Sequence, residues 1–193
     1  MPRLIVATSN PGKVEEMQAY LTDPDIHWEL ALKPADLEIE ETGETFLENA
    51  CLKASQVAQA LGEWAIADDS GLAVNALGGA PGIYSARYGT SDPDRINRLL
   101  TELGDRSDRQ AQFVCAIAIA NPTGEVVLQT EGICPGEILP APRGSNGFGY
   151  DPIFYVPEQA MSFAEMPAEV KNLVSHRGRA FQALLPKLKA LKS

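Results

Sequence analysis

The first candidate for chemistry in this sequence is the segment Thr8-Ser9-Asn10-Pro11-Gly12-Lys13. It contains two hydroxyls, one side-chain amide and one ammonium group. It follows the apolar run 4–7, which predicts a buried strand, and precedes a helix that Asn10 would cap and Pro11 would open. The free N–H groups and positive dipole end of a helix N-terminus suit a phosphate. The stretch is not a Walker A loop, because position 7 lacks the glycine and position 14 the hydroxyl. Taken alone, a capped helix with a solvated lysine is the commoner interpretation.

Two groups of carboxylates could bind a divalent cation or activate water. Residues 36–48 hold six acids and no base, with Glu40 near their centre. Asp68 and Asp69 follow the apolar run 64–67, so they emerge at a strand end, where α/β sites form. Adjacent residues of an extended chain point opposite ways, so one acid can face a cleft while the other braces the turn. Mg²⁺ usually takes one or two carboxylates plus phosphate and water. The simpler alternatives are an exposed acidic loop and an Asx-turn.

Three further positions carry groups that nucleotide binding uses. Lys53 lies one turn after Asn49 on the polar side of a predicted helix, although a lone helical lysine is usually solvated. Phe148 lies between two glycines and could stack on a base, although a loop aromatic more often packs into the core. His176, one of two histidines, opens the last predicted helix, where a simple N-cap by Ser175 is the alternative.

The predicted elements that position these groups alternate between strands and helices. Helical spacing and end signals predict helices over residues 11–21, 46–61, 92–103 and from 176 onward. The second of these has a capping box at Thr45 and Glu48 and ends before Gly62. Strands are predicted over residues 4–7, 64–67, 113–120 and 125–130, and glycine- and proline-rich loops over 78–89 and 135–157. This alternation indicates the α/β class with a mixed sheet.

Composition limits the class of protein. With 193 residues, 45% hydrophobic and 22% charged, the chain suits one globular domain. No apolar run approaches the roughly 18 residues of a membrane span, and no secretory signal precedes the first strand. The net charge of −10 disfavours nucleic acid as a partner. Cys51, Cys115 and Cys134 are scattered, which argues against disulfides or a zinc site and for a reducing compartment, the cytoplasm.

Together these segments resemble the inosine triphosphate pyrophosphatase family, over nearly the whole chain and in order. Enzymes of that family hydrolyse deaminated purine nucleoside triphosphates to the monophosphate and pyrophosphate. The resemblance is carried by residues 8–13, 40–43, 46–53 (FLENACLK), 67–88 (ADDSGLAVNALGGAPGIYSARY), 148–152 and 175–178. Ser9 and Asn146 depart from it, because glycine is frequent at these positions in relatives. Neither departure removes a charged group.

The resemblance implies a fold, a metal and a set of residue roles. The fold is a single domain over residues 1–193, an elongated mixed β-sheet with flanking helices and two lobes around a central cleft, assembled as a homodimer. Thr8 to Lys13 and Lys53 would hold the triphosphate, and Glu40 and Asp69 would bind Mg²⁺. Asp69 would also be the catalytic base, a role that Asp68 could share because a carboxylate bound to Mg²⁺ is a poorer base. The nucleoside pocket would be completed by Ser70, Phe148, Gly149, Tyr150, Asp151, Lys171, His176 and Arg177.

We therefore expect a magnesium-dependent enzyme that hydrolyses inosine, deoxyinosine and xanthosine triphosphates and so cleanses the nucleotide pool. A triphosphate brings about four negative charges, which this acidic protein must screen locally with lysines, a helix N-terminus and Mg²⁺. Two alternatives stay open: a nucleotide pyrophosphatase of other base specificity, such as the related Maf-like enzymes, and a nucleotide-binding module without turnover. The segments around Phe148 and His176 favour the first function, and the intact acids and lysines argue against a pure sensor.

Overall fold

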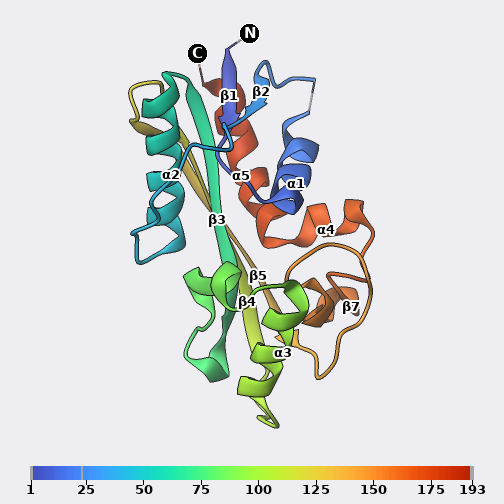
Figure 1. The fold of residues 1–193 in the computed structure, drawn as a ribbon. Coiled ribbons are helices and arrows are strands. Elements are labelled where there is room, and N and C mark those ends of the chain that lie inside the picture. Colours follow the sequence, from blue (N-terminus) through green and yellow to red (C-terminus); the bar gives the residue numbers. More distant parts are fainter. Residues whose placement is uncertain (1, 23, 192–193) are drawn as a thin grey trace. The chain divides into compact units, whose positions relative to one another are not determined.

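The structure, a computed structural model, describes residues 2–22 and 24–191 (Figure 1). Its strands are β1 (Arg3–Val6), β2 (Glu29–Leu32), β3 (Trp64–Val74), β4 (Gln110–Ala120), β5 (Val126–Ile138), β6 (Phe154–Val156) and β7 (Met161–Ser162). Its α-helices are α1 (Pro11–Leu21), α2 (Phe46–Leu61), α3 (Asp92–Leu103), α4 (Ala168–Val174) and α5 (His176–Ala190). Short 3-10 helices cover Asn75–Leu77, Gly82–Arg87, Asp151–Ile153 and Pro157–Gln159. No described helix is both long enough and apolar enough to cross a membrane.

The described strands form one mixed sheet in the order β2-β1-β3-β4-β5-β6-β7. The strand β1, second from one edge, runs parallel to both β2 and β3. At the other end of the order, β6 runs antiparallel to both β5 and β7. Parallel and antiparallel pairs in one sheet, with helices between the strands in sequence, confirm the predicted α/β class with a mixed sheet.

The chain divides into two compact units. Unit 1 comprises Met1–Asp69, Cys115–Gly132 and Arg179–Ser193, and unit 2 comprises Ser70–Val114 and Ile133–Gly178. The strands β3, β4 and β5 and the helix α5 therefore contribute residues to both units. The boundary within β3 falls between Asp69 and Ser70.

In unit 1, alternate residues of the strands face opposite sides of the sheet. One side packs against α1 and α5 and includes Leu4, Val6, Ile66, Cys115, Ile117, Met17 and Phe181. The other side packs against α2 and includes Ile5, Ala65, Ala67, Ala116, Ala54 and Val57. Figure 1 shows α2 on one side of these strands and α1 with α5 on the other. This alternation assigns Asp68 to the side of Ile66 and Asp69 to the side of Ala67.

The two helix starts that the sequence predicted in unit 1 are confirmed. The side chain of Asn10 accepts hydrogen bonds from the backbone N–H groups of Gly12 (3.0 Å) and Lys13 (3.2 Å). Thr45 and Glu48 form both bonds of the capping box, and Gly62 ends α2 in the left-handed conformation with φ 65°. These local signals fix where α1 and α2 begin, and hence where Lys13 and Lys53 stand.

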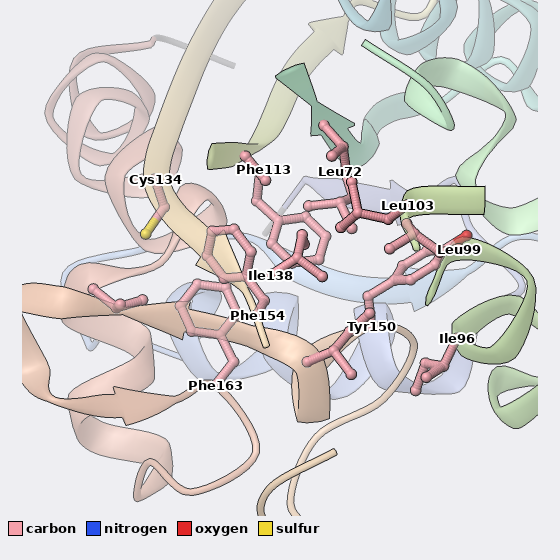
Figure 2. Close-up of a cluster of buried hydrophobic side chains, with 14 of the residues drawn as sticks. Leu72, Ile96, Leu99, Leu103, Phe113, Cys134, Ile138, Tyr150, Phe154 and Phe163 are labelled. Carbon is pink, nitrogen blue, oxygen red and sulfur yellow. The ribbon is translucent and has the colours of Figure 1, made fainter. Parts of the chain in front are cut away.

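Unit 2 is built around an aromatic core (Figure 2). The ring of Phe113 meets that of Phe154 edge-on at 4.6 Å between centroids, and Phe154 lies 4.8 Å from Phe163. Leu99 and Leu103 of α3 and Leu72 of β3 complete the same cluster. Because Leu72 is fully buried there, it holds the continuation of β3 beyond Asp69 in place.

Several expectations for the chain path are wrong. The strand predicted over 64–67 continues as β3 to Val74, so Asp68, Asp69 and Ser70 lie within a strand and not in an Asx-turn. The stretch 135–157 is mostly loop as predicted, since residues 139–150 form neither helix nor strand, but β5 extends through Pro135 to Ile138 and β6 covers Phe154–Val156. The elements β2, β6, β7 and α4 were not predicted, and all are short, at seven residues or fewer.

Candidate active site

The turn before α1 is accessible, but two of its N–H groups are already occupied. Ser9, Asn10 and Pro11 are exposed, and Thr8, Gly12 and Lys13 are partly exposed. The Asn10 side chain accepts from the N–H groups of Gly12 and Lys13, and the Thr8 hydroxyl oxygen accepts from the N–H of Asn10 at 3.2 Å. The groups best able to meet a phosphate here are therefore the Ser9 hydroxyl and the Lys13 ammonium.

Lys13 reaches back to the first acid of β3. Its Nζ lies 3.2 Å from Oδ2 of Asp68, whose side chain is fully buried, whereas 15% of the Lys13 side chain is exposed. The thiol of Cys115 lies 4.0 Å from the same oxygen. A buried carboxylate is stable only with a compensating partner, so this pair both neutralises Asp68 and fixes the direction of Lys13.

Lys53 of α2 joins two carboxylates from different parts of the chain. Its Nζ lies 3.2 Å from Oδ1 of Asp69 and 3.3 Å from Oε1 of Glu41. The side chains of Lys53 and Asp69 are each 8% exposed. Burial opposes the charged form of Lys53, but Asp69, Asp68 and Glu41 together raise the pKa of this lysine above its usual value. Lys53 therefore stays protonated and can serve as a fixed positive charge.

Asp69 keeps one carboxylate oxygen available. Its Oδ2 is buried and has no hydrogen-bond partner among residues 2–22 and 24–191, whereas Oδ1 is bound by Lys53. Burial raises the pKa of Asp69 above its usual value; Lys53 and Lys13 oppose this rise, and the charges of Glu41 and Asp68 add to it. A higher pKa makes a carboxylate a better proton acceptor.

This cluster has the composition that a magnesium site needs. Three carboxylates (Asp68, Asp69 and Glu41) face two lysines, which leaves one net negative charge. Mg²⁺ is commonly held by one or two carboxylates with water and substrate phosphate. Among the described residues, no three or more His, Cys, Asp or Glu side chains are arranged so that they could hold a metal ion by themselves. The Oδ2 of Asp69, which has no hydrogen-bond partner among the described residues, could meet either a metal shared with substrate or the attacking water.

Glu40 and Glu41 play different parts in the structure. The Glu41 side chain turns to Lys53, whereas Glu40 is exposed. The backbone of Glu40 is held instead, because its N–H donates to Oε1 of Gln56 at 2.9 Å and its carbonyl accepts from Nε2 of Gln56 at 2.8 Å. The structure thus places the backbone of the expected metal ligand Glu40 and leaves its carboxylate in solvent.

In unit 2, Asp151 organises the loop that carries Phe148. Its Oδ2 accepts from the backbone N–H of Phe148 at 3.0 Å and from Nζ of Lys171 at 2.7 Å. That ammonium lies 5.1 Å from the centre of the Phe148 ring, within range of a cation–π contact. Gly147 has φ 73°, and a Cβ there would overlap Oδ2 of Asp151. Phe148 is half-buried, so the ring is held from one side and keeps an accessible surface.

Two residues that the sequence did not single out support the same loop. The backbone N–H of Gly149 donates to Oδ2 of Asp92, the first residue of α3, at 2.8 Å. The hydroxyl of Tyr150 donates to the carbonyl of Ser85 at 2.7 Å, and burial raises the pKa of Tyr150, so it remains a donor. The Phe148 loop is therefore tied to two separate elements of unit 2.

The start of α5 combines a cap with two buried basic side chains. Ser175 accepts from the N–H of Gly178 at 3.1 Å, so the simple N-cap interpretation holds for this serine. The His176 ring is stacked on Phe113 with 4.6 Å between centroids and 13° between planes. Arg177 is 1% exposed, and its Nη2 donates to the hydroxyl of Ser70 at 2.9 Å. The cap thus positions a histidine and an arginine inside unit 2.

Comparison with known proteins decides the family. A model of the Ham1 family matches residues 4–187. The chain belongs to the Ham1 family. A protein of a Nostoc species named dITP/XTP pyrophosphatase is 68% identical over 190 residues, 98% of this chain and 96% of that one. A Synechocystis relative of the same name is 60% identical over 192 residues, 100% and 98% of the two chains. The solved HAM1 protein from Coxiella burnetii has a TM-score of 0.89 at 42% identity, covering 99% and 100%.

These matches confirm the family predicted from sequence, and the structure shows which expected residues of this Ham1 chain lie together. In unit 1, Lys13 pairs with Asp68 and Lys53 with Asp69. In unit 2, Asp151 contacts both Phe148 and Lys171. Separately, Arg177 contacts Ser70. Glu41, Gln56, Ser85 and Asp92 were not singled out as site residues, although Glu41 belongs to the acidic run 36–48 and Gln56 lies one turn after Lys53 on α2.

Proposed function

We propose that this protein hydrolyses deaminated purine nucleoside triphosphates, the triphosphates of inosine, deoxyinosine and xanthosine, to the monophosphate and pyrophosphate. The observation that carries the proposal is the buried cluster of unit 1, in which Lys53 holds Oδ1 of Asp69 and leaves Oδ2 open. The close relatives named dITP/XTP pyrophosphatase support the same substrate class.

The polyphosphate would be bound by unit 1. Lys13 and Lys53 are the cations of the cluster, and the Ser9 hydroxyl at the accessible turn can donate to a phosphate oxygen. Fixed positive charges of this kind stabilise the negative charge that develops on a leaving group. When bound, Mg²⁺ would neutralise phosphate charge and the pyrophosphate that leaves, with Asp69 as a ligand and Glu40 as a second.

Asp69 would activate the attacking water. Its pKa is raised by burial, so the carboxylate accepts a proton more readily than an exposed aspartate does. The water oxygen forms a bond to the α-phosphorus, and the bond from that phosphorus to the bridging oxygen breaks. Pyrophosphate leaves with the electron pair, and the water proton passes to Asp69. Asp68 is less suited to this step, because it is fully buried and bound by Lys13.

The base would be recognised by unit 2. Phe148 is partly exposed and would stack on the base, and the Lys171–Asp151 pair lies against its ring. Hypoxanthine and xanthine carry an oxygen at the position where adenine carries an amino group. Arg177 and a protonated nitrogen of His176 are donors, so they match the oxygen and not the amino group. Leaving such buried donors unmatched costs about 1–3 kcal/mol per group, which disfavours adenine.

The remaining expectations follow from composition and family. We propose Mg²⁺ as the cofactor, the cytoplasm as the location and a homodimer as the active form. Cys51, Cys115 and Cys134 form no disulfide with one another, which suits a reducing compartment. The net charge of −10 makes nucleic acid an unfavourable partner.

Steady-state kinetics on inosine triphosphate, ATP and GTP with Mg²⁺ test this function. We expect kcat/KM for inosine triphosphate to exceed the value for ATP by at least about 100-fold, as two unmatched donors would give. We expect a similar preference over GTP, which these two donors do not explain, because guanine carries the same oxygen as hypoxanthine. Comparable values for all three would refute the base specificity and favour a pyrophosphatase of broader range. Binding without turnover would favour the non-catalytic nucleotide-binding module.

A further inference from the structure

One face of α2 holds the acidic segment 40–43 in place through three residues spaced along the helix. Asn49, Lys53 and Gln56 follow each other at intervals of four and three, so they lie on one side of the helix. Asn49 accepts from the N–H of Gly43 at 2.8 Å, and Lys53 binds the Glu41 carboxylate at 3.3 Å. The third residue, Gln56, has no part in the site assigned above.

The side-chain amide of Gln56 forms the same two hydrogen bonds with the backbone of Glu40 that a neighbouring β-strand would form. It accepts from the N–H of Glu40 at 2.9 Å and donates to the carbonyl of Glu40 at 2.8 Å. Residues 37–43 form neither helix nor strand, so a side chain supplies the partners that a sheet would otherwise give. Leu37 and Ile39 pack against the α2 side of the core of unit 1, and Glu40 is exposed to solvent.

We propose that Gln56 is a positioning residue for the metal: it holds the backbone at Glu40 so that the carboxylates of Glu40 and Glu41 are presented in fixed places. The inferred role in metal binding rests on the proposed function, whereas the two hydrogen bonds between Gln56 and Glu40 do not depend on it. An untethered carboxylate loses conformational freedom when it binds a cation, and this loss weakens binding. The double hydrogen bond removes the backbone part of that freedom in advance. Loss of Gln56 therefore weakens metal binding more than it slows the chemical step.

A matched pair of variants separates this role from general support of the helix. Gln56→Met keeps the length of the side chain and removes both hydrogen bonds. Gln59→Met makes the same change on the same helix, where Nε2 of Gln59 lies 3.4 Å from the carbonyl of Thr123, in a different loop. Circular dichroism checks that both variants fold. If Gln56→Met does not fold, Gln56→Ala replaces it, because alanine is the strongest helix former.

Three measurements on the full chain are needed. Amide hydrogen exchange at Glu40 reports the contact itself, and titration with Mn²⁺, followed by its electron paramagnetic resonance signal, reports metal affinity without turnover. The Mg²⁺ concentration for half-maximal hydrolysis of inosine triphosphate links both to activity. In Gln56→Met we expect exchange at Glu40 to accelerate, and both the Mn²⁺ dissociation constant and the Mg²⁺ requirement to rise about tenfold. At saturating Mg²⁺, kcat should fall less than about threefold, and Gln59→Met should match the wild type in all three measurements.

Each contrary result has a distinct meaning. If exchange at Glu40 accelerates but Mn²⁺ affinity stays within about twofold of wild type, Gln56 only anchors a loop and the proposal is wrong. Unchanged exchange overturns the contact itself, and absence of Mn²⁺ binding by the wild type overturns the metal assignment. If the wild type binds Mn²⁺ but does not hydrolyse inosine triphosphate, the proposed function fails, while the exchange and Mn²⁺ results still decide the role of Gln56.

Discussion

Asp68 and Asp69 are neighbours in β3, yet they pair with lysines from two different helices. Lys13 at the start of α1 binds Asp68, and Lys53 of α2 binds Asp69, each at 3.2 Å. Strand alternation explains this, since consecutive residues of β3 face opposite sides of the sheet. The two acids are therefore not interchangeable. The Asp68 side chain is fully buried, whereas 8% of the Asp69 side chain is exposed.

The first prediction separates the two acids by substitution. Asp69→Asn should lower kcat by about 10²–10⁴-fold, because it removes the oxygen that accepts the proton, and it should leave the dissociation constant for nucleotide nearly unchanged. Asp68→Asn should mainly lower the melting temperature and raise KM, because Lys13 loses its buried partner. Steady-state kinetics, nucleotide titration and thermal unfolding of both variants measure this. An Asp68→Asn variant with the larger loss of kcat would reverse the assignment.

The second prediction concerns pH. Burial raises the pKa of Asp69 above its usual 3.8, and a protonated Asp69 cannot accept a proton. The acid limb of kcat/KM should therefore lie above pH 3.8, with activity lost as the pH falls through it. Lys53 is the strongest of the charges that lower this pKa, so Lys53→Met should move the limb to higher pH. If the acid limb of kcat/KM in Lys53→Met stays at the wild-type pH or moves to lower pH, Asp69 is not the group whose protonation causes it.

The third prediction compares two glycines with similar backbone angles. Gly147 has φ 73° and Gly78 has φ 64°, so an alanine at either position is strained by about 1–2 kcal/mol. Only at Gly147 would the added Cβ overlap Asp151, which holds Phe148 and Lys171; at Gly78 no atom lies within 4 Å. Gly147→Ala should therefore raise KM for inosine triphosphate by about tenfold or more, whereas Gly78→Ala should change stability alone. Equal KM values would show that the Phe148 loop does not bind the base.

The fourth prediction tests the support of that loop by Asp92. Its Oδ2 accepts from the N–H of Gly149 at 2.8 Å, and its Oδ1 binds Arg95 at 2.6 Å. Asp92→Ala should raise KM for inosine triphosphate several-fold, since one hydrogen bond is worth about 0.5–1.5 kcal/mol, with little change in kcat. Arg95→Met removes the ion pair and the hydrogen bond from Nε of Arg95 to the carbonyl of Ala86, but keeps the bond from Gly149 to Asp92, and so serves as the control. If both variants shift KM equally, the ion pair, and not the bond to Gly149, is what matters.

Local sequence signals predicted the parts of the fold that depend on local hydrogen bonds. The helix starts at Asn10 and Thr45 follow from side chains that bond to the backbone two or three residues away, and both are confirmed. The path of β3 was missed because Asp68, Asp69 and Ser70 have turn chemistry. These residues stay in a strand because Leu72 and Val74, further along β3, are buried in the core of unit 2. That burial depends on residues distant in the sequence, so a local sequence pattern does not reveal it.

The candidate site was predictable in its residue types but not in all its contacts. The pairing of Lys53 with Asp69 joins residues 16 positions apart, and the bond from Gly149 to Asp92 spans 57 positions. Nothing in the run Glu40-Glu41 indicates which side chain turns to Lys53. That choice is made by α2, whose residue Gln56 holds Glu40 by its backbone.

The most direct test of the central claim is to hydrolyse inosine triphosphate with Mg²⁺ in water labelled with ¹⁸O and to analyse the products by mass spectrometry. Attack of water on the α-phosphorus predicts inosine monophosphate and pyrophosphate in equal amounts, with the label in the monophosphate and none in the pyrophosphate. Inosine diphosphate and labelled orthophosphate as first products would contradict the account, because the water would then have attacked the terminal phosphorus.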